Sequence, residues 1–116
     1  MEMRLHDVPF QQIKDGIKTV EMRLNDEKRQ KLKVGNYIDF VHTQDDTNRV
    51  KAKVVALHYY STFKALLSDN LFDKCGCNGY TVESAAECMY QYYAPEQERL
   101  YGVVGIKIEL VSGNQI

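Results

Sequence analysis

The stretch GIKTVEMR, residues 16–23, leads into an alternation of polar and apolar side chains that continues to Leu24. Residues 19–24 follow a period of two, the pattern of a β-strand with one buried face. Glu21 and Arg23 share its polar face about 7 Å apart along the strand, and Lys18 stands at its start behind a glycine. Two interpretations fit this pattern: a solvated strand face with an ion pair of little energetic weight, or the floor of a binding site.

The binding-site interpretation has a definite chemistry. Lys18 and Arg23 supply two cationic donors, and Glu21 supplies one acceptor. This set suits a polar ligand with both carbonyl and amino edges, such as a nucleobase with its phosphate. A catalytic alternative has Lys18 beside Glu21 as a general base in a desolvated pair, with Thr19 adjoining. No zinc signature, phosphate-binding glycine loop or nucleophile elbow is found in the sequence.

Length and charge restrict the possible classes of protein. The 116 residues suit a single domain over 1–116, and the net charge of −1 gives no overall sign of a nucleic-acid binder. A local basic cluster nevertheless includes Lys28 and Arg29 and continues to residue 33. No apolar run approaches the roughly 20 residues of a membrane helix, and the first residues do not resemble a signal peptide. We therefore expect a cytoplasmic protein with no membrane partner.

The three cysteines are Cys75, Cys77 and Cys88. An odd number without a secretory signal favours reduced thiols. Cys75 and Cys77 are separated by one residue rather than the two to four of zinc knuckles, and no histidine is close in sequence. The pattern predicts incidental thiols, with no metal site and no cofactor.

Seven of the eight tyrosines lie in the second half of the chain, which is relevant because single-stranded RNA binders stack bases on aromatic rings. Tyr90 and Tyr93 belong to an apolar helical stripe and are predicted to lie in the core. Tyr92 falls off that stripe, and Tyr101 precedes a strand beside Gly102. Tyr92 and Tyr101 are therefore the better candidates for contacts with a ligand.

Hydrophobic periodicity predicts five strands, at 1–6, 19–24, 37–42, 49–60 and 104–110. A polar, turn-rich hairpin loop is expected over 43–48, which favours antiparallel pairing. Short helices are expected from Asp7 to Gly16, over 26–32, after Ser61 or Thr62, and from Thr81 until Pro95 ends the last of them. Short strands without long crossover helices predict an α+β fold built on a small, partly closed barrel.

The motif residues resemble a known family. Gly16, Lys18, Glu21 and Arg23 match the G-x-K-x-x-E-x-R pattern of ASCH domains, which belong to the PUA-like superfamily. The segments NDEKRQKLKVGNYIDF (25–40) and YGVVGIKIEL (101–110) extend the resemblance. It implies a small PUA-like β-barrel of about five to six mostly antiparallel strands with flanking short helices. It also implies a cleft lined by the motif lysine, glutamate and arginine, and a role connected with RNA or modified nucleosides.

One branch of that family, the acetylcytidine amidohydrolases, resembles this chain at Gly16, Lys18, Thr19 and Arg23. Glu21 stands where that branch carries its catalytic threonine. The segment KCGCNGY (74–80), where the branch has its catalytic acid, contains no carboxylate after Asp73. The departures favour a binding module for RNA or a nucleotide over the alternative, a small hydrolase of modified nucleosides or RNA, amidohydrolase-like or ribonuclease. A protein-binding domain is the third possibility.

The predicted ligand-binding residues are Lys18, Thr19, Glu21, Arg23, Lys28, Arg29, Tyr92 and Tyr101, with Lys18 and Glu21 as the candidates for catalysis. The geometry of three of them discriminates between the interpretations. If Lys18, Glu21 and Arg23 converge on one concave pocket with Tyr92 or Tyr101 on its wall, a base-sized ligand is supported. If their side chains splay into solvent, the ligand hypothesis fails.

Overall fold

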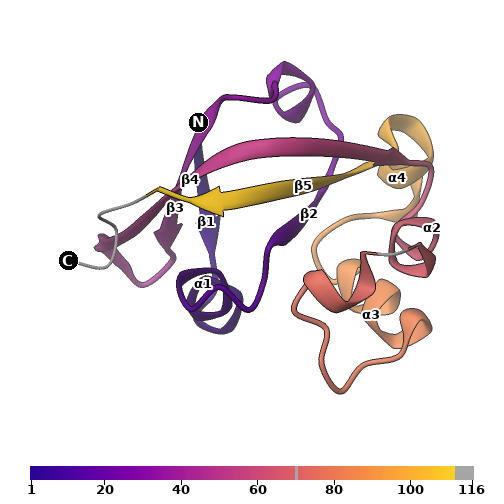
Figure 1. Ribbon diagram of the computed structural model, residues 1–116. Helices are drawn as coiled ribbons and strands as arrows, with labels where there is room; N and C mark the ends of the chain where they lie inside the picture. Colours follow the sequence, from indigo (N-terminus) through magenta and orange to yellow (C-terminus); the bar gives the residue numbers. More distant parts are fainter. Residues whose placement is uncertain (70, 112–116) are drawn as a thin grey trace.

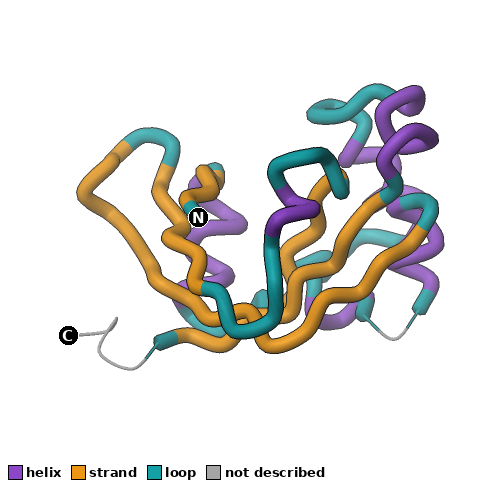
Figure 2. The backbone as a smooth tube through the Cα atoms, turned by 90° about the horizontal axis from the view of Figure 1, so that it is seen from above, coloured by secondary structure: helices purple, strands orange, loops and turns teal. Residues whose placement is uncertain are grey.

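The computed structural model describes residues 1–69 and 71–111. Five strands form one sheet in the order β1-β3-β4-β5-β2, which curls into a half-barrel (Figures 1 and 2). β1 pairs with β3 in parallel, and the other neighbours pair antiparallel. The predicted α+β, PUA-like barrel architecture is therefore confirmed. The strands are β1 (Glu2–Leu5), β2 (Val20–Leu24), β3 (Tyr37–His42), β4 (Asp45–Tyr60) and β5 (Val103–Leu110).

Short helices flank the sheet on two sides. α1 lies beside the β1–β3 end, whereas α2, α3 and α4 gather where β4 ends and β5 begins (Figure 1). No helix formed by the described residues combines the length and apolar character needed to cross a membrane. The helices are α1 (Asp7–Lys14), α2 (Phe63–Ser68), α3 (Val82–Met89) and α4 (Pro95–Tyr101), with 3-10 turns η1 (Arg29–Lys31) and η2 (Phe72–Lys74).

Two apolar clusters form the core, and both include residues of β5. The first fills the half-barrel beneath α1 and includes Phe10 and Phe40. The second joins the helical side of the molecule to β2 and includes Phe63 together with Val20 and Met22 of that strand. Because elements cover both faces of β2, its polar face is buried as well, which a period-two pattern alone does not reveal.

The β3–β4 hairpin is tighter than predicted. A loop over 43–48 was expected, but β4 begins at Asp45 and only a two-residue turn, Thr43–Gln44, separates it from β3. Asp45 accepts hydrogen bonds from the backbone N–H and the hydroxyl of Thr47. The hairpin projects into solvent, so its residues are polar on both faces and lack the alternation that signals a strand.

The prediction of one long helix from Thr81 that ends at Pro95 was wrong. α3 stops at Met89, a turn follows, and Pro95 occupies the first turn of α4. A proline suits that position because its missing N–H is not needed there and its φ is already helical. The Gln97 side chain accepts a hydrogen bond from the backbone N–H of Ala94, which closes the start of this second helix.

Other helix boundaries were predicted more closely. Thr62 and Thr81 cap α2 and α3 as expected, each accepting a hydrogen bond from a backbone N–H in the first turn. The helix expected over 26–32 is only the single turn η1, which follows an Asp26 carboxylate that accepts from the N–H of Arg29. Asp26 forms a local turn there, and no apolar stripe continues it into a helix.

Candidate functional site

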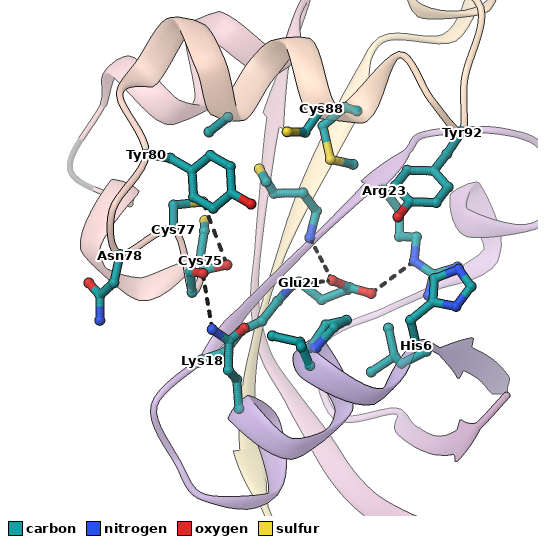
Figure 3. Close-up of a pocket in the computed structure, with 18 of the residues that line it drawn as sticks. His6, Lys18, Glu21, Arg23, Cys75, Cys77, Asn78, Tyr80, Cys88 and Tyr92 are labelled. Carbon is teal, nitrogen blue, oxygen red and sulfur yellow. Dashed lines mark hydrogen bonds and ion pairs between the residues drawn. The ribbon is translucent and has the colours of Figure 1, made fainter. Parts of the chain in front are cut away.

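A cavity of about 550 Å³ lies between α1 and the segments around α3, with β2 as its floor (Figure 3). Pockets of roughly 300–1,000 Å³ are the usual size for small-molecule ligands. Four parts of the chain line it: residues 4–12, the motif segment 18–23, the loop 75–80 and residues 85–93. The site is therefore assembled from segments that are far apart in sequence.

The motif side chains form a buried ion cluster on the pocket floor. The Nζ of Lys18 lies 2.9 Å from Oε1 of Glu21, and the Nε of Arg23 donates to Oε2 at 3.0 Å. The Glu21 side chain is 4 % exposed, that of Lys18 is 9 % and that of Arg23 is 15 %. The backbone N–H of Met22 also donates to Oε1, at 3.2 Å. The polar face of this strand is thus a pocket floor and not a solvated surface.

The cluster keeps Glu21 ionised. Burial alone favours the neutral carboxyl, but the charges of Lys18 and Arg23 and their hydrogen bonds outweigh it and lower the pKa of Glu21 to about 2. A carboxylate of such low basicity is a poor general base at neutral pH. The Glu21 carboxylate pairs with two cations beneath the cavity.

This pKa shift predicts acid sensitivity. The folded-state pKa of Glu21 is depressed, so its stabilisation is complete above the ordinary carboxyl pKa of 4.5 and is lost as pH falls towards about 2. We expect the free energy of unfolding to decline across that window, with Glu21 contributing roughly 3 kcal/mol of the decline. Urea titrations at several pH values measure it. If the free energy of unfolding of a Glu21→Gln variant fell as steeply with pH as that of the wild type, Glu21 would not be the group responsible.

The loop 75–80 packs against the floor through a glycine. Gln12 Nε2 donates to the carbonyl of Gly76 at 3.2 Å, and the carbonyl of Gln12 accepts from the N–H of Lys18. Gly76 has φ +75°, and a Cβ there would lie 2.5 Å from Oε1 of Gln12 and 3.3 Å from a Lys18 side-chain carbon. Only glycine allows this approach, so Gly76 brings the loop down onto α1 and Lys18.

The cysteines predicted to be incidental line the pocket, Cys75 and Cys77 on the loop and Cys88 on α3. Burial, followed by the neighbouring Cys77, raises the pKa of Cys75 to about 12, with only partial opposition from Lys18. Burial also raises the pKa of Cys77. Both thiols are therefore neutral at physiological pH and poor nucleophiles. Within 1–69 and 71–111, no three His, Cys, Asp or Glu side chains are grouped to hold a metal ion.

Aromatic side chains flank the floor. Figure 3 shows Glu21 in the centre of the pocket, with Tyr80 on one side and Tyr92 and His6 on the other. Tyr80 is 51 % exposed and Tyr92 59 %, so both rings can contact a ligand that enters. The His6 and Tyr92 ring centres are 5.9 Å apart, which joins α1 to the turn after α3. Tyr93, expected in the core, lines the pocket and stacks on Phe63 at 5.7 Å.

The structure brings together four of the eight predicted residues, because Lys18, Glu21, Arg23 and Tyr92 line this pocket. Thr19 instead lines a second hollow of about 310 Å³ beside β5. Lys28 and Arg29 lie at η1, where Arg29 pairs with Asp26 at 3.6 Å, and Tyr101 ends α4; none of these three lines the larger pocket.

Several residues that line the pocket were not predicted, because no local sequence pattern marks them. Gln12 and His6 look like ordinary residues of a short helix and its start. Tyr80 and Asn78 are the lining residues that the sequence marks best, because they lie just before the helix cap Thr81 in a loop with two glycines. Loops with such glycines often carry functional residues, so that segment merited attention.

Comparisons with known proteins show the family and the fold of the chain. The family model of the ASCH domain matches residues 3–112. The chain is similar to the crystal structure of hypothetical protein PH0355, with a TM-score of 0.81 and 33 % identity over 95 % of this chain and 97 % of that one. It is also similar to the solution structure of protein PF0455 from Pyrococcus furiosus, with a TM-score of 0.72 and 27 % identity over 97 % and 99 %. The search of curated proteins returned no match. The chain belongs to the ASCH domain family.

Proposed function

We propose that this protein binds RNA or a nucleotide-derived small molecule, with one planar base held in the pocket above the Lys18–Glu21–Arg23 cluster. The observation that carries the proposal is the burial of this cluster beneath a cavity of about 550 Å³. Buried charges are costly, and ionisable groups gathered and perturbed in a cleft mark a candidate functional site.

Charge and shape both favour a nucleotide. The cluster contains two cations and one carboxylate; Arg4 also lines the pocket, with its guanidinium paired to Asp46 at 2.8 Å. Glu21 is the one carboxylate among the described residues that line the pocket, so the site favours oxygen-rich and anionic ligands. Tyr80 and Tyr92 offer exposed ring faces on which a base can stack.

Binding is better supported than hydrolysis. Glu21 is a weak base, the Cys75 and Cys77 thiols are neutral, and Thr19 lies outside the pocket. Among the described residues that line the pocket, none is a serine or threonine. An acyl-transfer reaction needs an activated nucleophile beside a base, and Glu21, Cys75, Cys77 and Thr19 do not form such a pair.

The experiment is a calorimetric titration with nucleoside monophosphates and short single-stranded RNAs at low salt. Tyr80→Ala and Tyr92→Ala are each expected to weaken binding about 5- to 100-fold, the usual value of one stacked base. The matched control is Tyr59→Ala, because Tyr59 is 58 % exposed on β4 and does not line the pocket. Absence of binding, or equal effects of the Tyr80 and Tyr59 substitutions, would refute the proposal.

The same protein preparation tests the hydrolase alternative. Incubation with acylated nucleosides and with RNA, followed by chromatography, is expected to leave both intact. Turnover that disappears in Lys18→Met while binding is retained would favour an enzyme instead. A salt titration adds an independent check, since contacts to RNA phosphates make the affinity fall as salt rises.

A further inference from the structure

We infer that the pocket selects a cyclic imide edge, as carried by uracil-type bases, over the amino-bearing edges of cytosine and adenine. The inference rests on the proposed function and specifies its ligand. It follows from which hydrogen-bonding capacities of the floor are already used and which are free. The motif alone suggested a ligand with both carbonyl and amino edges. The contacts within the floor favour carbonyl groups instead.

The acceptor capacity of Glu21 is nearly exhausted. An ionised carboxylate accepts about four hydrogen bonds, two on each oxygen. Oε1 is engaged by the Nζ of Lys18 and the backbone N–H of Met22, and Oε2 by the Nε of Arg23. One acceptor position is left, on Oε2. The floor can therefore receive a single N–H from a ligand and not the two N–H bonds of an amino group.

Donor capacity, in contrast, is in surplus on both sides of the carboxylate. The Lys18 ammonium has three N–H bonds and finds one partner, Glu21, among the described residues. Arg23 has five; its Nε serves Glu21 and its Nη2 donates to the carbonyl of Arg4 at 3.0 Å, while Tyr93 interacts with the same guanidinium. Because both side chains are largely buried, a ligand that supplies no acceptors would leave these donors unsatisfied.

The floor thus presents donor, acceptor, donor in the order Lys18, Glu21, Arg23. The Watson–Crick edge of uracil presents the complement: a carbonyl oxygen, the N3–H and a second carbonyl oxygen. Cytosine and adenine place an amino donor where a cation already donates, and guanine presents two adjacent donors to one remaining acceptor. Mismatched edges leave buried groups unpaired, which is the strongest basis for discrimination between similar ligands.

The other walls suit such a ring. Met22, Ala85 and Met89 line the cavity as apolar groups and require no hydrogen bonds from the carbon edge of a pyrimidine. Tyr80 and Tyr92 remain available for its faces. His6, Gln12 and Asn78 are further polar residues of the lining, and the inference concerns the three charged residues of the floor.

The test compares uridine, cytidine and N3-methyluridine monophosphates by calorimetry. Uridine monophosphate is expected to bind at least about ten-fold more tightly than either of the other two, because cytidine exchanges a carbonyl for an amino group and the methyl group removes the N3–H. Pentanucleotides of uridine and of cytidine repeat the comparison in RNA. Tighter binding of the mononucleotides would identify a free nucleotide as the ligand, and tighter binding of the pentanucleotides would identify an RNA base.

Lys18→Met is expected to reduce the uridine-over-cytidine preference to less than about three-fold, since it removes one donor and keeps most of the side-chain volume. Lys64→Met is the control, because Lys64 is exposed on α2 and away from the pocket, and it should retain the full preference. Thermal melts verify that both variants fold. If Lys18→Met does not fold, the affinities of the wild-type protein for the three nucleotides test the inference.

Four results count against the inference. Equal binding of uridine and cytidine, or equal binding of N3-methyluridine and uridine, refutes the imide preference and leaves the proposed function standing. A preference unchanged in folded Lys18→Met removes Lys18 from the recognition. Absence of binding by every nucleotide and RNA refutes the proposed function together with this inference.

Discussion

Replacing Glu21 with glutamine is expected to lower the free energy of unfolding by about 3–5 kcal/mol, because it leaves two buried cations without their counter-charge. The carboxylate lies within 3.0 Å of donors on both Lys18 and Arg23. Glutamine keeps the shape of the side chain, so the loss reports the charge and not a cavity. Urea denaturation at neutral pH measures it.

The matched control is Glu109→Gln, because Glu109 is an exposed carboxylate of β5 and its charge is well solvated. It should be close to neutral in the same assay. The double variant Lys18→Met/Glu21→Gln removes one of the stranded cations and should be more stable than the sum of its two single changes implies. A loss of less than about 1 kcal/mol in Glu21→Gln would show that the cluster carries little of the stability.

Glu98→Ala has the second largest expected effect, a loss of about 2–4 kcal/mol. This carboxylate is only 4 % exposed and joins three helices. From α4 it accepts the backbone N–H of Phe63 at the start of α2, at 2.9 Å, and the hydroxyl of Tyr90 after α3, at 2.8 Å. Alanine would leave a buried N–H without a partner and loosen the helices that hold one wall of the pocket.

Glu96→Ala is the control for this change. Glu96 lies in the first turn of the same helix, is exposed, and pairs with Arg99 at 3.5 Å. Thermal denaturation of the two variants should separate them clearly, with Glu98→Ala melting well below Glu96→Ala. Coincident melting curves would mean that the link between α2 and α4 contributes no net stability.

Much of the sheet could be predicted from local patterns. The strands β2, β3 and β5 alternate clearly, and the caps Thr62 and Thr81 mark two helices correctly. The prediction of helix boundaries failed where one residue is compatible with two local structures. Pro95 both disfavours helix before it and begins one after it, and only the packing of α4 decides between the two.

Of the residues that line the candidate pocket, the three charged floor residues and one wall residue, Tyr92, were predicted from the sequence. The spacing of Lys18, Glu21 and Arg23 identified the floor, because side chains on one strand face are set by the strand itself. The burial of the floor could not be foreseen, since the loop around Gly76, which packs against Lys18, lies more than 50 residues along the chain. The basic residues near Lys28 were equally suggestive in sequence, yet the fold places them away from this pocket.

The amino-acid sequence by itself determined the local facts about this protein: which residues form strands, which residues start two of the helices, and which three charged side chains share one face. Those depend on interactions between near neighbours. Tertiary structure alone decided that this face is buried, that Glu21 remains ionised there, and that most of its acceptor capacity is used while Lys18 keeps N–H bonds without a partner among the described residues. Solvation and hydrogen-bond partners arise from distant segments packed together, and they turn GIKTVEMR from an alternating strand into the floor of a pocket.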